Sequence, residues 1–328
     1  MKKMIVFGII FVMAFMMVSN PLTDEFISHI KGNSLEVSIK KDSLYHEIVL
    51  NSEKYKVPAS DAKIDRVWKA MPGYNGLKVD IEASYKKMKE IGEFEEEKLV
   101  FQQVRPAVHL EELPPAPIYK GHPDKPMVSF IINVAWGNEY LSDMLATLKK
   151  HHVSATFFLE GRWVQKYPDL AKMIADAGHE IGNHSFTHPD LKVSSTAKIR
   201  QEMTKTNEVI KATIGSSPVW FAPPSGSYRD EVVTIAAEEK MGTIMWSVDT
   251  VDWQKPSPDV LINRVMSKVH NGAIILMHPT SSTAQSLDRL IISIKQKQLQ
   301  INTITELVKE ERLVDSFSIE KMKDNNKN

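Results

Sequence analysis

Two histidines four residues apart, His184 and His188, are the side chains of this sequence best suited to metal chemistry. On a helical turn, this spacing would place both imidazoles on one side, within reach of a single ion. Asp252 and His278 lie further along the chain, each after an expected strand, and form a second candidate pair. A histidine pair alone is a weak signal, because such residues also hold loops by hydrogen bonds. Metal binding and a structural role both remain open for this pair, and Asp252 with His278 could equally be a structural ion pair.

These residues fall at the ends of expected strands. Apolar segments predict strands at 128–134, 155–159, 180–184, 219–221, 243–246 and 273–277. Helices are expected between them, at 140–151, 168–177, 196–214, 231–240, 259–270 and 286–297. Such alternation is typical of a parallel sheet covered by helices. We therefore predict a distorted (β/α) barrel in which a site lies at the carboxyl ends of the strands.

The sequence before this barrel has a different pattern of apolar and polar residues. Residues 21–105 predict a small α+β domain, with strands at 35–39 and 48–50 and a helix at 80–91. Ser60 or Asp61 is expected to cap another helix, which would run through Trp68 and Ala70. Six prolines between 106 and 126 indicate an extended linker or a strap over the next domain, and a proline-motif ligand for a partner is the alternative. The barrel domain is expected at 127–310, followed by a polar tail at 311–328.

Composition and the N-terminus narrow the functional classes. The 328 residues include 41 Lys and Arg against 41 Asp and Glu, so the overall charge favours neither nucleic acid nor anionic lipid. The absence of cysteine excludes disulfides and thiol catalysis. Lys2 and Lys3 precede an apolar run from Met4 to Val18, which predicts a signal peptide or a short membrane anchor within residues 1–20. We expect an exported, extracytoplasmic protein, secreted or held at the membrane by this segment.

Taken together, the motifs resemble the polysaccharide deacetylases of carbohydrate esterase family 4, the NodB homology domain. The resemblance covers about the last 180 residues and looks closest to membrane-linked envelope deacetylases of spore-forming bacteria. The matching motifs are His-x-x-x-His at His184 and His188, Asp-x-x-Asp-Trp at Asp249, Asp252 and Trp253, Pro-Pro at Pro223 and Pro224, and Leu-x-His at Leu276 and His278. By resemblance, the barrel would be of the NodB type, and its substrate would be peptidoglycan or a related N-acetylated glycan.

The resemblance also implies a role for each matching residue. His184 and His188 would hold zinc or a similar divalent ion, whose bound water attacks the acetyl carbonyl. His278 would be the acid that protonates the leaving amine, and Asp252 would pair with it. The acetyl group would lie against an apolar wall made by Trp253, Leu276 and Pro224, although Trp253 could also be an ordinary core residue.

Two motifs depart from the family pattern. Where the family has Thr-Phe-Asp-Asp-Gly, this chain has Ala135 at the position of the base Asp and Trp136 at the position of the metal-binding Asp. The family arginine that pairs with the base is replaced by Ala222. Losing both members of a buried ion pair can be nearly neutral for stability. The matched losses therefore indicate a site whose task has changed, with weak or absent deacetylation and doubtful metal binding.

Three functions remain open at this point. The first is a non-catalytic protein of the cell envelope that binds glycan in the old substrate groove. The second is an active hydrolase with a rearranged site, in which a carboxylate such as Asp249 or Glu160 replaces the missing groups. The third is a scaffold that binds a partner through its N-terminal domain.

Overall fold

The computed structural model describes residues 43–313, which group into two compact units. The described part of the smaller unit comprises residues 43–57 and 77–102, and the larger unit comprises residues 58–76 and 103–313. We expected domain boundaries at 105 and 126, whereas residues 58–76 and 103–126 group with the larger unit. The exact domain boundaries stay a prediction. The expected leader, the strand at 35–39 and the tail beyond 313 lie outside the described residues.

The smaller unit combines helices with a two-stranded sheet. It holds most of the strands β3 (Gly76–Val79) and β4 (Phe101–Val104), whose ends at Gly76 and at residues 103–104 group with the larger unit. Its helical elements are residues 43–52, η1 (Glu53–Tyr55), α3 (Ile81–Met88) and η2 (Glu96–Lys98). The expected helix at 80–91 is confirmed, with Asp80 accepting a hydrogen bond from the Ala83 amide as its N-cap. The strand expected at 48–50 is wrong. Leu44 and Ile48 are both buried and lie one helical turn apart, which favours a helix with a single apolar face.

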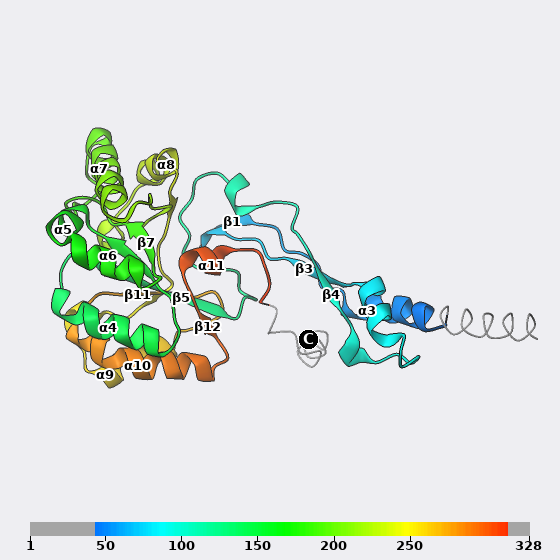
Figure 1. The fold of residues 1–328 in the computed structure, drawn as a ribbon. Coiled ribbons are helices and arrows are strands. Elements are labelled where there is room, and N and C mark those ends of the chain that lie inside the picture. The colour runs from blue at the N-terminus through cyan, green and yellow to red at the C-terminus, as the bar shows by residue number, and fades with distance from the viewer. Residues whose placement is uncertain (1–42, 314–328) are drawn as a thin grey trace, which may run out of the picture. The chain divides into compact units, whose positions relative to one another are not determined.

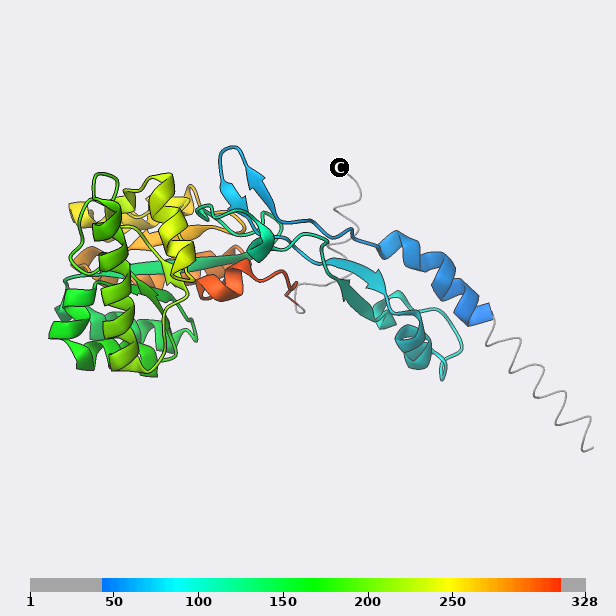
Figure 2. The same ribbon diagram turned by 90° about the horizontal axis from the view of Figure 1, so that it is seen from above.

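The helix expected from Ser60 or Asp61 is also wrong. The chain instead forms an antiparallel hairpin of β1 (Lys63–Asp65) and β2 (Lys69–Met71), drawn in blue in Figure 2. The Asp65 carboxylate accepts hydrogen bonds from the amides of Val67 and Trp68 and so closes the turn. Asp61 caps no helix, because its carboxylate accepts hydrogen bonds from Ala107 and Val108.

A parallel sheet forms the centre of the larger unit. Its strand order is β10-β11-β5-β6-β7-β8-β9, and β12 also pairs with β5. The strands are β5 (Met127–Val134), β6 (Thr156–Leu159), β7 (Glu180–Asn183), β8 (Trp220–Phe221), β9 (Gly242–Thr243), β10 (Val248–Asp249), β11 (Ile274–Met277) and β12 (Gln300–Ile301). Every residue of β5 is buried, which explains why its sequence is a near-continuous apolar run, interrupted only by Ser129 and Asn133.

Helices cover the outside of this sheet. Figure 1 shows α4, α9 and α10 together along one part of it, and α5, α6 and α7 along another. The helices are α4 (Asn138–Lys150), α5 (Gly161–Lys166), α6 (Pro168–Asp176), α7 (Thr196–Ile214), α8 (Asp230–Glu238), α9 (Pro258–Met266), α10 (Ser281–Gln296) and α11 (Ile304–Val308). The curled parallel sheet with outer helices confirms the predicted distorted barrel of the NodB type. Within residues 43–313, no helix combines the length and apolar character that a membrane crossing requires.

The proline-rich segment lies as a strap on the larger unit. Ile118 is almost fully buried and forms bridges with Lys69 and Ile244. Lys125 is also buried, and its ammonium donates hydrogen bonds to the carbonyls of Glu306 and Lys309, 2.6 Å each, at the end of α11. Of the two forms expected for residues 106–126, the described structure has the strap.

Candidate functional site

The residues singled out by the sequence meet at the carboxyl ends of the central strands. Trp136 follows β5, His184 follows β7, Asp252 follows β10 and His278 follows β11. Most of them line a single cavity of about 400 Å³. Its lining residues are Asn133, Ala135, Trp136, His184, His188, Ser225, Trp246, Asp249, Trp253, Leu276 and His278. Side chains up to 145 positions apart in the sequence are thus gathered into one pocket, as expected for a parallel barrel.

The histidine pair is held by a loop. The expected helical turn is wrong, because Ser185 and His188 both have left-handed backbone conformations, with φ of 61° and 54°. The two rings nevertheless lie edge to face, with centroids 5.0 Å apart. The buried Glu202 fixes the loop by accepting hydrogen bonds from the backbone amides of Phe186 and Thr187. Proximity of the pair was therefore predicted correctly, but for a different local reason.

Burial sets the protonation of these histidines. His184 is almost fully buried, and this burial lowers its pKa to about 3. Burial also lowers the pKa of His188. The neutral His184 donates from Nδ1 to the carbonyl of Ala222, 2.8 Å away, which leaves Nε2 unprotonated. This hydrogen bond selects the tautomer that a metal ligand needs.

A metal ion does not fit the described residues. Within residues 43–313, no group of three His, Cys, Asp or Glu side chains is arranged to hold an ion. Trp136, at the position of the missing carboxylate, stacks its ring on His278 with centroids 5.9 Å apart and planes at 9°. A catalytic zinc normally requires three protein ligands, and an indole supplies none. The two histidines remain, but the third ligand is gone.

The acid side of the site is fully formed. Asp252 is completely buried, and its Oδ1 lies 2.8 Å from Nδ1 of His278. Its Oδ2 accepts hydrogen bonds from the His278 amide and the Thr283 hydroxyl, both at 2.6 Å. The carboxylate therefore orients the imidazole and fixes its backbone at once. The structure brings together the pair that the sequence predicted, while the catalytic roles stay predictions.

The proposed apolar wall is only partly as expected. Trp253 and Leu276 line the cavity, and Trp253 is 56 % exposed, so the interpretation of Trp253 as a core residue is wrong. Pro224 is buried in the short 3-10 turn η4 (Pro224–Gly226), and its neighbour Ser225 reaches the cavity instead. Trp246 was missed as a site residue. It follows β9, so its position after a strand was the signal that could have identified it.

The two candidate substitutes for the lost carboxylates face different spaces. Asp249 lines the cavity that holds His184 and His278. Glu160 lines a neighbouring cavity, where burial raises its pKa. Only Asp249 is therefore placed to act on a group bound between the histidines.

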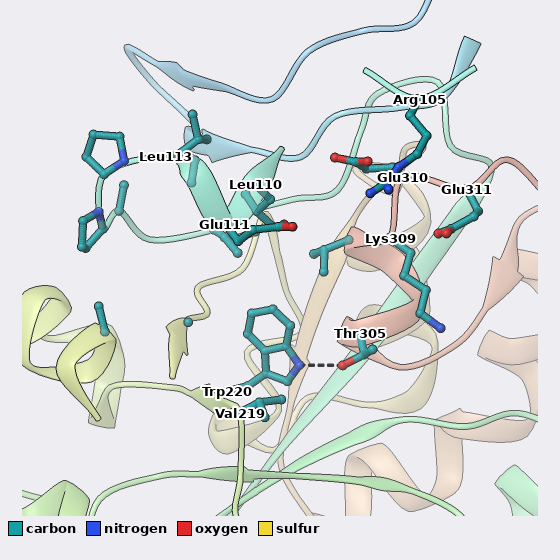
Figure 3. A pocket seen from close by; sticks show the side chains of 18 residues that line it. Arg105, Leu110, Glu111, Leu113, Val219, Trp220, Thr305, Lys309, Glu310 and Glu311 are labelled. Carbon is teal, nitrogen blue, oxygen red and sulfur yellow. Dashed lines mark hydrogen bonds between the residues drawn. The ribbon is translucent and has the colours of Figure 1, made fainter. Parts of the chain in front are cut away.

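A larger cavity of about 540 Å³ lies at the other ends of the strands, near the first residues of β8 and β9. Figure 3 shows Trp220 and Thr305 joined by a hydrogen bond on one side of it, with Arg105 and Glu310 on another. None of the residues matched to the deacetylase motifs lines this cavity. The candidate site is the smaller one.

Comparison with known proteins decides the family. A family model described as polysaccharide deacetylase matches residues 120–244. The crystal structure of BA3943, a CE4 family pseudoenzyme from Bacillus anthracis, is 56% identical, with a TM-score of 0.78 over 82% of this chain and 96% of that one. The chain belongs to carbohydrate esterase family 4, the polysaccharide deacetylases.

Two further relatives match different lengths of the chain. YlxY of Bacillus subtilis strain 168 is 56% identical over 316 residues, which is 95% of this chain and 99% of that protein. The peptidoglycan-N-acetylmuramic acid deacetylase PdaA of the same strain is 32% identical over 200 residues, or 60% of this chain and 76% of PdaA. A crystal structure of a BA3943 variant is described as a pseudoenzyme with restored enzymatic activity.

Proposed function

We propose that this protein is an inactive polysaccharide deacetylase of the cell envelope, which binds an N-acetylated glycan without hydrolysing it. The observation that carries this proposal is Trp136, an aromatic ring stacked on the acid histidine where the family places a metal-binding carboxylate. One substitution thus removes a ligand and adds a surface suited to binding. The pseudoenzyme BA3943, similar over most of the chain, supports the same conclusion.

The loss of the base and of the third metal ligand is large enough to prevent deacetylation by the family mechanism. A general base contributes about 10²–10⁴-fold to the rate of such reactions, and Ala135 cannot act as one. Without the third ligand, an ion on His184 and His188 would be held weakly, so little metal-activated water would form. The intact Asp252 and His278 pair can still deliver a proton, but it has no attacking nucleophile to assist.

The cavity retains the features of a sugar site. Trp136, Trp246 and Trp253 line it, and their flat rings suit the apolar faces of pyranose rings. Polar groups for hydroxyl and amide contacts come from Asn133 and Asp249. Asn133 is buried, and its Oδ1 has no hydrogen-bond partner within residues 43–313, so a donor on the ligand would satisfy it. Its volume of about 400 Å³ lies within the usual range for small-molecule sites.

The proposed ligand is peptidoglycan or a glycan of the same type. PdaA, which shares the deacetylase domain, is named for N-acetylmuramic acid in peptidoglycan. We propose that residues 1–20 direct export as a signal peptide or a short membrane anchor, so that the protein meets this glycan outside the membrane. A role in the envelope of a spore-forming cell belongs to the same proposal.

A binding assay with a matched variant tests this function. Purified protein should be retained by insoluble peptidoglycan, and Trp136→Ala should reduce retention about 10-fold or more, because the stacking surface is lost. Trp68→Ala removes a tryptophan that lines neither cavity beside the histidines and should leave retention unchanged. Equal retention of all three proteins, or none, would reject glycan binding in this cavity.

A rearranged hydrolase is the second candidate, because Asp249 lines the same cavity as His278. Acetate release from N-acetylated peptidoglycan or chitin oligomers that disappears in both His278→Ala and Asp249→Asn would establish it. If the protein is neither retained by insoluble peptidoglycan nor able to release acetate, a partner-binding scaffold is the remaining function.

A further inference from the structure

The hairpin of β1 and β2 presents apolar side chains to solvent. It belongs to the larger unit, and Figure 2 shows its turn standing out from the body of that unit. Ile64 is 47 % exposed and Val67, in the turn, is 64 % exposed. A single exposed apolar residue needs no explanation, but two of them on one protruding hairpin form a candidate contact surface.

Three cations accompany these apolar side chains. Lys63, Arg66 and Lys69 are all exposed, and their side chains take part in no hydrogen bond or ion pair within the described part of the chain. The one carboxylate of the hairpin, Asp65, is occupied by two backbone amides of the turn. The hairpin therefore has a formal charge of +2, whereas the whole chain is neutral.

The base of the hairpin adds an aromatic ring and a further cation. Trp68 is half-buried, and Nζ of Lys120, in the proline-rich strap, lies 5.2 Å from the centroid of its ring. The next apolar residue, Ala70, is buried in the core cluster that contains Ile118, which fixes the hairpin to the unit. Tryptophan is enriched at the level of lipid headgroups, where one part of the ring is in apolar surroundings and the other is wet.

This combination of groups favours one class of partner. An anionic polymer dissolved in water would pair with the cations and leave Ile64 and Val67 in water. A neutral apolar surface would cover Ile64 and Val67 and gain nothing from the cations. The surface of a bilayer that contains anionic lipid uses both, because its phosphates pair with Lys and Arg while apolar side chains enter the boundary of the acyl chains.

We propose that the β1–β2 hairpin binds the larger unit to the surface of a membrane that contains anionic phospholipid. Ile64 and Val67 enter the headgroup region, and the three cations of the hairpin pair with lipid phosphates. The contact is small, so it is reversible and is weakened by salt. No residue of the hairpin lines the cavity that holds the histidines, so this inference does not depend on the proposed glycan binding.

A fluorophore on the hairpin tests this contact in the full-length protein. The chain contains no cysteine, so Val67→Cys provides a single attachment site for an environment-sensitive dye. Vesicles of phosphatidylglycerol and phosphatidylcholine in equal parts should shift the emission of the dye to shorter wavelength, and vesicles of phosphatidylcholine alone should not. Raising the salt concentration to about 0.5 M should reduce the shift. Because the dye reports its own surroundings, membrane contact of another segment does not produce this signal.

A matched position controls for the dye itself. Val260 is 49 % exposed on α9, and Figure 1 shows α9 and the hairpin on opposite sides of the larger unit. The same dye on Val260→Cys should not shift with either kind of vesicle. An equal shift at both positions would mean that the dye inserts by itself and would overturn the proposal.

Charge variants test the role of the cations. Lys63→Gln with Arg66→Gln, added to Val67→Cys, should raise the lipid concentration needed for half of the shift about 10-fold or more, since each cation beside an anionic surface is worth about 5-fold. Lys149→Gln with Lys172→Gln removes the same charge from exposed positions outside the hairpin and should leave the titration unchanged.

The remaining outcomes reject the proposal in different ways. No shift at residue 67 would mean that the hairpin does not enter a membrane surface. A shift that survives the loss of Lys63 and Arg66, or that is equal with phosphatidylcholine alone, would exclude recognition of anionic lipid. A shift caused by soluble polyphosphate and not by vesicles would assign the hairpin to a dissolved anionic polymer instead. Retention by insoluble peptidoglycan is a separate measurement, and its failure would leave each of these results standing.

Discussion

The two halves of the candidate site differ in which of the family's motif residues they retain. On the acid side, Asp252 makes three hydrogen bonds, to two atoms of His278 and to Thr283, and all of them are buried or nearly so. On the metal and base side, Ala135, Trp136 and Ala222 stand at the positions of charged family residues. A carboxylate tied into the local backbone is costly to remove, because it leaves buried donors without an acceptor. A base paired mainly with one arginine can be lost together with that arginine at little cost.

The comparison indicates what the retained motif residues have in common. His184 also survives on the lost side, and its hydrogen bond to the Ala222 carbonyl needs the backbone of residue 222, not the side chain. Of the retained motif residues, His184, Asp252 and His278 thus each make a hydrogen bond within the fold. By the family resemblance, the base Asp and the Arg that are replaced at Ala135 and Ala222 would have paired with each other.

The largest expected effect comes from rebuilding the lost half. Ala135→Asp, Trp136→Asp and Ala222→Arg together should raise zinc- or cobalt-dependent acetate release at least about 100-fold, because base and third ligand return beside an intact acid. Acetate release from N-acetylated oligomers measures this. Trp136→Asp alone should gain metal affinity, measured by calorimetric zinc titration, without comparable activity. The BA3943 variant with restored enzymatic activity makes this outcome reasonable.

Adding His278→Ala to the rebuilt protein provides the decisive control. The regained activity should disappear, since the rebuilt protein then lacks the acid His278. A folded triple variant that binds zinc yet releases no acetate would show that the acid side is not intact, and the comparison between the two halves would fail.

The second effect concerns stability on the acid side. Asp252→Ala should lower the free energy of unfolding by about 3 kcal/mol, because the His278 amide and the Thr283 hydroxyl lose their buried acceptor. Thr283→Val removes two hydrogen bonds of the Thr283 hydroxyl, one donated to Asp252 and one accepted from the Thr280 hydroxyl, and should cost about 1–2 kcal/mol. Urea unfolding of the wild type and both variants gives these values. Equal costs would mean that the carboxylate has little structural value and survives for another reason.

The third effect is a pH dependence from the histidines. His184, with its pKa of about 3, stays neutral in the fold, while the same side chain in the unfolded chain takes up a proton below about pH 6.5. Its contribution to stability is therefore complete above pH 6.5 and decreases as the pH falls toward 3, by up to about 1.4 kcal/mol per pH unit. His184→Gln should make the decline of unfolding free energy between pH 6 and pH 4 shallower by about this amount.

His179 is the matched control for this measurement. It lies outside the site, and burial alone lowers its pKa to about 4. His179→Gln should therefore reduce the slope in the same direction and over nearly the same range. A slope that changes with His179→Gln but not with His184→Gln would show that His184 is protonated in the fold.

Much of the architecture could be predicted from the sequence. Strands buried on both faces, such as β5, are near-continuous apolar runs and are recognisable without alternation. His184, Asp252 and His278 follow the strands β7, β10 and β11 of the parallel sheet, and this topology brings them together. The short strands β10 and β12 were missed, because a two-residue strand carries no period.

The errors have local physical causes. Ile48, Val49 and Leu50 are as apolar as a strand, and only the burial of Leu44 together with Ile48 shows the helical period. The four-residue spacing of His184 and His188 suggested a helical turn, whereas left-handed residues and Glu202 hold the loop. Such loop geometry depends on side chains distant in sequence, so the sequence pattern near the histidines could not indicate it.

The smallest expected effect tests whether the two halves are linked. Trp136 belongs to the lost side and His278 to the retained side, and their stacked rings are a direct contact between them. A double-mutant cycle of Trp136→Ala and His278→Ala should give a coupling of about 0.5–1.5 kcal/mol in the free energy of unfolding, the usual range for stacked aromatic pairs. Because Trp136 is half exposed, a value near the lower end is expected. A coupling within error of zero would mean that the contact between Trp136 and His278 adds nothing to the stability of the fold, and that the two halves are not energetically linked through it.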